Sequence, residues 1–248
     1  MKPPVPRIDW ARVMAFRTRR HHLHRRTPKK TMLEVVASIC GLQAQLMSSV
    51  QLAMWARIEG LTLADVRDAL WKHRRLVKTW AMRGTLHVLH ADDYLLWQRP
   101  LGAYAHHTKP GWLRRCGLTP QELDEAVSAI GRALGRRLLT REQLANEVTR
   151  VLGTSALGDI LRQGWGFMLE PAAFHGQLCF APSIGVNVRF ARPDVWLRRA
   201  PRPDSHAGWI DLTRRFSSGV WSRHPSRLFA LERSAARARG RDVTIAGT

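Results

Sequence analysis

Residues Leu76–Leu89 read LVKTWAMRGTLHVL, two runs of β-branched, aromatic and apolar residues separated by Arg83-Gly84. This pattern around a glycine-containing break predicts a β-hairpin. Three stretches with apolar residues at helical spacing precede it, and we expect helices over 31–40, 49–57 and 62–73. Three short helices followed by a hairpin is the element order of a winged-helix module.

Helix starts in this chain are marked by capping-box spacing, in which a Thr is followed three residues later by Glu or Gln. The spacing occurs at Thr31-x-x-Glu34, Thr119-Pro120-x-Glu122 and Thr140-x-x-Gln143. The last two motifs predict helices in the second half of the chain, where Pro120 suits a first helical position.

The second half repeats the element order of the first. A third helix is expected over 156–175, with Pro171 as a point where it can break. The runs Gln177–Ala181 and Val186–Phe190 then flank a Pro-Ser-Ile-Gly turn signal, which predicts a second hairpin. We therefore expect a mainly α protein with short β-hairpins (α+β), built from tandem winged-helix modules.

The expected domain boundaries follow from these elements. They are a basic N-terminal helix and arm (1–30), a first winged helix (31–90), a helical connector (91–118), a second winged helix (119–200) and a basic tail (201–248). The tail lacks sustained periodicity, so we expect it to be weakly ordered or an incomplete third module.

The charge of the chain indicates a polyanionic partner. Lys and Arg number 40 against 19 Asp and Glu, which gives a net charge of +21. Each phosphate that a protein neutralises releases condensed counterions, so such an excess favours nucleic acid. A codon preference for Arg would raise the Arg content, but it does not explain why the number of acidic residues is not raised in proportion. We expect double-stranded DNA as the partner and, because no coiled-coil heptads occur, a monomer.

The cysteines and apolar runs indicate the compartment. Cys40, Cys116 and Cys179 are widely spaced and form no Cys-x-x-Cys pair, which is typical of free thiols in a reducing compartment. No apolar run approaches the roughly 20 residues that a membrane span needs. The first ten residues also lack the apolar core of a signal peptide. A cytoplasmic, nucleoid-associated protein that does not bind membranes is expected.

Several classes of enzyme lack their motifs here. His21, His22 and His24 lie among arginines with no thiolates nearby, which disfavours zinc. The chain contains no Gly-x-x-x-x-Gly-Lys phosphate loop and no Gly-x-Ser-x-Gly elbow. We therefore predict no cofactor and no metal.

The segment Gly41-Leu-Gln-Ala-Gln45 carries the candidate chemistry. If the backbone is extended, the amides of Gln43 and Gln45 project the same way, and each offers a donor and an acceptor with which to orient a water. The alternative is that both are ordinary polar surface residues. Asp92 is a second catalytic candidate, although Asp92-Asp93 more simply caps the next helix, where its charge suits the helix dipole.

These residues resemble a known family. Leu42-Gln-Ala-Gln45, preceded by Arg19-Arg-His-His-Leu23 and followed by Thr79-Trp-Ala-Met-Arg-Gly-Thr-Leu-His87, resembles the winged-helix DNA glycosylases of the AlkZ/YcaQ kind. FHGQLCFAP (174–182) and FARPDVW (190–196) are similar to that family's later hairpin region, so the resemblance covers roughly residues 8–200.

The resemblance implies a monofunctional DNA glycosylase. Family members that excise 7-alkylguanines and unhook interstrand crosslinks carry a Gln-apolar-Gln motif, whereas a sister branch has Asp in the last place. Gln43 and Gln45 match the first branch. Members of the family usually continue into a further winged helix, and the tail before Thr248 does not match one. A chain without that module is expected to have an incomplete DNA-binding surface, which puts its activity in doubt.

The predicted DNA contacts come from the basic N-terminal run and the first hairpin. Arg83, Thr85 and His87 alternate along the predicted strand and are expected to share one face. A structural hairpin with one solvated side is the alternative. The predicted DNA-binding residues are Arg19, Arg20, His21, Arg25, Arg26, Lys78, Arg83, Thr85 and His87. The competing function is that of a non-catalytic winged-helix regulator or architectural protein.

Overall fold

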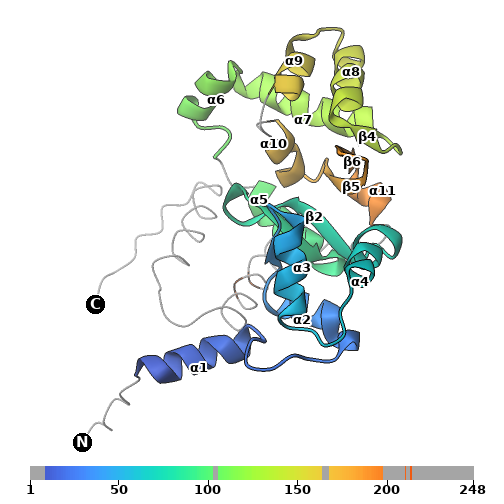
Figure 1. Ribbon diagram of the computed structural model, residues 1–248. Helices are drawn as coiled ribbons and strands as arrows, with labels where there is room; N and C mark the ends of the chain where they lie inside the picture. The colour runs from blue at the N-terminus through green and yellow to red at the C-terminus, as the bar shows by residue number, and fades with distance from the viewer. Residues whose placement is uncertain (1–8, 103–105, 164–167, 198–209, 211–212, 214–248) are drawn as a thin grey trace, which may run out of the picture.

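The computed structural model describes residues 9–102, 106–163, 168–197, 210 and 213 (Figure 1). The predicted basic tail therefore lies almost entirely outside the described residues. The described chain is a mixed α/β structure, which confirms the predicted combination of helices and short antiparallel strands. None of its helices has the length and apolar character needed to cross a membrane.

The first half of the described chain contains one three-stranded sheet. Its elements are α1 (Trp10–Arg20), a 3₁₀ turn (Lys29–Thr31), α2 (Met32–Ser38), β1 (Leu42–Gln43), α3 (Met47–Trp55), α4 (Leu63–Arg67), a π-helical turn (Asp68–Lys72), β2 (Leu76–Trp80), a 3₁₀ turn (Met82–Gly84) and β3 (Leu86–His90). The predicted hairpin is confirmed, with Leu76 opposite His90 and Trp80 opposite Leu86. The short strand β1 was not predicted and pairs antiparallel with β3, so the order is β1-β3-β2.

The second half repeats this strand order. Its elements are a 3₁₀ turn (Ala91–Asp93), α5 (Tyr94–Gly102), α6 (Pro110–Cys116), α7 (Pro120–Leu134), β4 (Leu139–Thr140), α8 (Arg141–Leu152), α9 (Ala156–Gln163), α10 (Leu169–Phe174), β5 (Cys179–Ile184), β6 (Asn187–Ala191) and α11 (Pro193–Trp196). The second hairpin is confirmed. The sheet order β4-β6-β5 again places the short strand against the second strand of the hairpin.

Two of the three predicted capping boxes form. The Thr119 amide donates to Glu122 Oε2 at 2.7 Å, and the Thr140 amide donates to Gln143 Oε1 at 2.9 Å. The prediction at Thr31 is wrong, because its hydroxyl donates instead to the Pro28 carbonyl at 2.8 Å. A 3₁₀ turn runs directly into α2 there, so Thr31 lacks the extended backbone of an N-cap.

Pro171 does not interrupt the helix in which it lies. It is the third residue of α10, whose first-turn amides have no acceptor within the helix in any case. The predicted helix over 156–175 corresponds to α9 and α10, and the residues between them, 164–167, lie outside the described residues.

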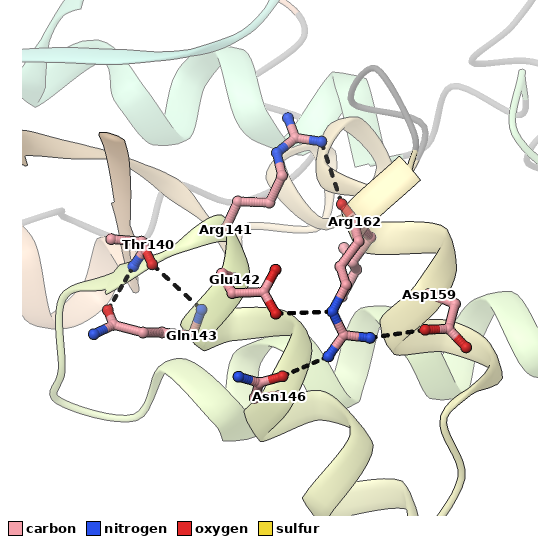
Figure 2. A network of polar contacts seen from close by, with 8 residues as sticks. Thr140, Arg141, Glu142, Gln143, Asn146, Asp159 and Arg162 are labelled. Atoms are coloured by element: carbon pink, nitrogen blue, oxygen red, sulfur yellow. Dashed lines mark hydrogen bonds and ion pairs between the residues drawn. The ribbon is translucent and has the colours of Figure 1, made fainter. Parts of the chain in front are cut away.

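Polar contacts of one arginine join α9 to α8 (Figure 2). Arg162 on α9 donates to Glu142 Oε1 at 3.0 Å on α8 and to Asp159 Oδ1 at 2.8 Å on its own helix. It also donates to Asn146, one turn beyond Glu142 on α8. The helices approach closely there, since a Cβ on Gly158 would lie 3.0 Å from the Ala145 carbonyl oxygen. In the second half, α8, which directly follows β4, is thus held in place by α9.

The two sheets share an apolar layer. It combines residues of the first half with residues of the second: Cys40, Val77, Ala81 and Leu89 with Ala91, Tyr94, Leu96, Trp97, Cys179, Ala181, Ala191, Trp196 and Leu197. Beside this layer the ring centroids of Trp80 on β2 and Phe180 on β5 are 4.9 Å apart. The position of the first hairpin therefore depends on the second.

Replacing Phe180 by Ala is expected to lower the free energy of unfolding by about 3–5 kcal/mol, because a buried aromatic ring leaves a cavity between the two hairpins. Urea denaturation followed by circular dichroism measures this change. Ile184→Ala on the same strand is the control, since Ile184 is exposed and should change stability by no more than about 0.5 kcal/mol. Equal effects of the two substitutions would contradict the interface described.

Candidate active site and nucleic-acid interface

Gln43 and Gln45 are both exposed, the first at the end of β1 and the second at the bend that follows it. Leu42 and Ala44 are buried, whereas Gln43 and Gln45 are exposed. The Ala44 amide donates to the Leu86 carbonyl at 2.7 Å, which continues the pairing with β3 past the end of β1. The pairing with β3 thus runs through Ala44, and exposed and buried side chains alternate from Leu42 to Gln45.

Gly41 brings this segment against β3. Its φ is +91°, and a Cβ at this position would lie 2.5 Å from Leu89 Cδ2 and 2.8 Å from the Val88 carbonyl oxygen. A backbone oxygen cannot move aside as the end of a side chain can. Glycine is thus required for both conformation and space, and it sets where β1 starts.

A row of polar side chains crosses the sheet at Gln43. In the strand register Gln43 lies opposite His87, and His87 lies opposite Thr79. Residues directly opposite on antiparallel strands point to the same face. His87 and Thr79 are both buried, and the Thr79 hydroxyl has no partner among the described residues. The exposed amide of Gln43 therefore lies in one row with the buried side chains of His87 and Thr79.

Hydrogen bonding holds the His87 ring. Its Nδ1 lies 2.9 Å from the Thr85 carbonyl oxygen. Burial lowers the pKa of His87 from its usual value, and the positive charge of Arg83 adds to this, while the bond to Thr85 opposes it. The imidazole is therefore neutral near pH 7.

The prediction that Arg83, Thr85 and His87 share one strand face is wrong for Arg83. Thr85 and His87 follow each other in extended backbone, but Arg83 lies in the 3₁₀ turn before β3 with φ +59°. Its side chain is exposed at that turn. The Thr85 hydroxyl donates to the Met82 carbonyl at 3.0 Å, so it stabilises the turn from within.

The second half of the chain supports this turn. A Cβ on Gly84 would lie 2.3 Å from Glu170 Oε1, so the carboxylate rests against the turn backbone. His107 Nε2 is 3.4 Å from the same oxygen, and the His107 ring contacts Trp112 and Phe174 edge-on. Glu170 and His107 were not predicted, because no sequence spacing links them to Arg83.

The basic N-terminal residues divide into exposed and docked groups. Arg19 and Arg20 on α1, together with Arg25, are exposed, and Figure 1 shows α1 extending away from the other helices. Arg26 instead lies over the Trp55 ring at 3.7 Å, and the His21 carbonyl accepts from Arg57 Nε at 2.8 Å. These contacts dock the segment after α1 onto the end of α3.

Two of the remaining predicted DNA-binding residues, His21 and Lys78, are partly buried. Burial lowers the pKa of His21, and the charge of Arg57 acts in the same direction. Lys78 on β2 is half-buried, with its ammonium 5.1 Å from the centroid of the Phe180 ring. Burial lowers the pKa of Lys78 as well. Both side chains are therefore less available to DNA than the exposed arginines.

Asp92 does not adjoin the glutamines. It lies beyond the end of β3, five residues after His87, which is roughly 15 Å along an extended chain. Its side chain is 67% exposed. The 3₁₀ turn that contains both aspartates is capped by His90, whose Nδ1 accepts from the Asp92 amide at 3.2 Å. Within the described ranges no three His, Cys, Asp or Glu side chains gather in a way that can hold a metal ion.

Comparisons with known proteins point to one family. The family model described as "DNA glycosylase AlkZ-like" matches residues 36–241. An interstrand DNA cross-link repair glycosylase of Streptomyces sahachiroi is 34% identical over 208 residues, covering 81% of this chain and 55% of that protein. The solved structure of DNA glycosylase AlkZ from the same organism matches with a TM-score of 0.78 and 28% identity, over 87% of this chain and 58% of that chain. This chain thus spans just over half the length of the relatives it matches.

Replacing Gly41 by Ala is expected to lower the free energy of unfolding by about 2–4 kcal/mol, through backbone strain and overpacking against Val88. Gly60→Ala is the matched control, because Gly60 also has positive φ (+62°) but has open space where a Cβ would lie. It should cost only about 1–2 kcal/mol. Chemical denaturation of both variants measures the difference, and an equal loss would show that Gly41 is not packed against β3.

Proposed function

The chain belongs to the AlkZ-like family of DNA glycosylases, and from this membership we propose that it is a monofunctional DNA N-glycosylase acting on alkylated purines in DNA repair. One observation supports the proposal: Gln43 and Gln45 are both exposed and alternate with the buried Leu42 and Ala44 where the chain pairs with β3. Substrates proposed for it are 7-alkylguanine adducts. Interstrand crosslinks are included because the Streptomyces relative is named a cross-link repair glycosylase.

The proposed reaction needs no metal and little acid catalysis. A 7-alkylated purine is cationic and departs as a neutral base, so the leaving group is already activated. What remains is to place a water beside C1′ of the sugar as oxocarbenium character develops there. Two fixed amides can hold that water and stabilise nearby charge without reorganising during the reaction.

We further propose that the two halves are tandem winged-helix modules with the boundaries 31–90 and 119–200. Each half has a helix, a short strand, further helices and a hairpin in that order, and in each the short strand pairs with the second hairpin strand. Residues 1–30 form a basic helix and arm, and residues 91–118 form the connector.

Double-stranded DNA is the proposed partner of a monomeric, cytoplasmic and nucleoid-associated protein. Arg19, Arg20, Arg25 and Arg83 are exposed and are proposed to contact phosphates. The other predicted DNA-binding residues, His21, Arg26, Lys78, Thr85 and His87, make contacts within the protein and are proposed to shape the surface around the site.

DNA binding is expected to depend strongly on salt. If about 6–10 phosphates are neutralised, affinity for duplex DNA should fall about 10³–10⁵-fold between 50 and 200 mM salt, because bound counterions are released on association. Fluorescence anisotropy with a labelled duplex measures this slope. A nearly flat salt dependence would show that the charge of +21 does not drive binding.

Replacing Gln45 by Ala is expected to lower the rate of base release about 10²–10³-fold, because a preorganised partner of the water is lost. DNA affinity should remain close to wild type, since one amide adds little to many phosphate contacts. Gln45→Asp should retain more activity than Gln45→Ala, because a carboxylate also accepts a hydrogen bond from water. Release of 7-methylguanine from duplex DNA under single-turnover conditions measures the rates.

The matched control is Gln121→Ala, which removes an exposed amide from α7, well separated from Gln45 in the chain, and should leave the rate unchanged. If the Gln45→Ala variant released 7-methylguanine at the wild-type rate, the glutamines would have no role in catalysis. A non-catalytic winged-helix DNA-binding protein would then be the better description.

A further inference from the structure

The proposed reaction leaves one proton without an acceptor. A water that bonds to C1′ must lose a proton, and an amide side chain cannot take it near neutral pH. Gln43 and Gln45 can orient the water but cannot complete the hydrolysis. A titratable group with a free lone pair beside them would accept this proton as the water attacks.

The strand register places His87 next to Gln43. The two residues are directly opposite each other on β1 and β3. The Ala44 amide bonds the Leu86 carbonyl, which makes the neighbouring pair a hydrogen-bonded one and the Gln43–His87 pair a non-hydrogen-bonded one. Side chains of non-hydrogen-bonded pairs lie closest in antiparallel sheets, with Cβ atoms about 4.5–5.5 Å apart on one face.

The hydrogen bond of the ring selects its tautomer. A carbonyl oxygen only accepts, so Nδ1 of His87 carries the hydrogen that it donates to Thr85. In the neutral ring the lone pair is then on Nε2. Among the described residues no group hydrogen-bonds Nε2 of this buried ring. The one basic nitrogen of the ring therefore has no competing donor among these residues.

We propose that His87 is the general base of the reaction. Its Nε2 takes a proton from the water held by Gln43 and Gln45 as the water oxygen bonds to C1′. The C1′–N9 bond breaks at the same time, and its electron pair leaves with the neutral 7-alkylguanine. The imidazolium then returns its proton to solvent. This inference rests on the proposed glycosylase function and adds to it a catalytic residue that the sequence had suggested as a DNA contact.

The surroundings of His87 favour the neutral form that this role requires. Arg83, on the turn before β3, is the charged group that acts on the ring, and together with burial it lowers the pKa of His87 below its usual 6.5. The charged residues on the neighbouring elements do not face the His87 ring. Lys78 on β2 lies on the opposite face of the sheet, Glu34 on α2 is exposed, and β1 contains no titratable residue. Tyr94 and Cys179 lie buried in the layer between the sheets. The ring is thus ready to accept a proton at pH 7 and loses that ability as the pH falls through its pKa.

Other nearby groups do not serve as well. The Thr79 hydroxyl is on the far side of His87 in the same row, and it does not ionise near neutral pH. Glu170 contacts the Gly84 turn rather than the strand pair that bears Gln43. Asp92 lies beyond the other end of β3.

The pH dependence of base release tests the proposal. Duplex DNA with one 7-methylguanine is incubated with excess protein from about pH 5 to pH 8, and spontaneous release is subtracted. The wild-type rate should fall as the pH drops through the His87 pKa. His87→Gln should be about 10²-fold slower near neutral pH, should lose this pH dependence and should keep its DNA affinity. Free imidazole should restore part of the rate to His87→Ala, which a merely structural role would not allow.

His90→Gln is the control, because His90 lies three residues further along the same strand and on its other face. It should keep the wild-type profile, and thermal unfolding of each variant establishes that it is folded. A wild-type pH profile in His87→Gln, or no rescue by imidazole in a folded His87→Ala, would overturn the assignment of His87 alone. Absence of base release by the wild-type protein would overturn the proposed function, and with it this inference.

Discussion

The backbone pairing of β3 is the constraint on which the rest of the structure depends. This strand bonds β1 along one edge and β2 along the other, and both faces of the small sheet are buried by apolar layers. Because side chains alternate with a period of two, a slip of one residue would exchange the polar row Gln43–His87–Thr79 for its apolar neighbours. Gly41 prevents that slip, since only glycine fits against Val88 at the start of β1.

The second half of the chain acts on the candidate site through packing. Phe180 holds β2 through Trp80, and Glu170 rests against the turn that presents Arg83. Neither residue lies in the row of polar groups. The site is therefore built on the first sheet but positioned by the second, which gives a physical reason for two similar modules to be joined by a shared apolar layer rather than by a flexible linker.

Charge and chemistry are divided between different parts of the surface. Exposed arginines on α1, on the arm after it and at the Arg83 turn supply positive charge for the proposed phosphate contacts, whereas the polar row contains no permanently charged group. A neutral row suits the proposed substrate base, which is cationic, because a nearby cation would oppose its binding. Burial of His87 serves the same end by keeping its ring neutral.

Local patterns in the sequence were sufficient for the hairpins and for the capping boxes at Thr119 and Thr140, since each depends on residues only a few positions apart. Tertiary structure alone decided that His87 lies opposite Gln43, that Arg83 occupies a turn rather than a strand, that Thr31 follows a 3₁₀ turn, and that Glu170 supports Gly84. The reason is physical: strand register and packing between distant segments are set by the burial of whole faces, and no short spacing in the chain encodes them.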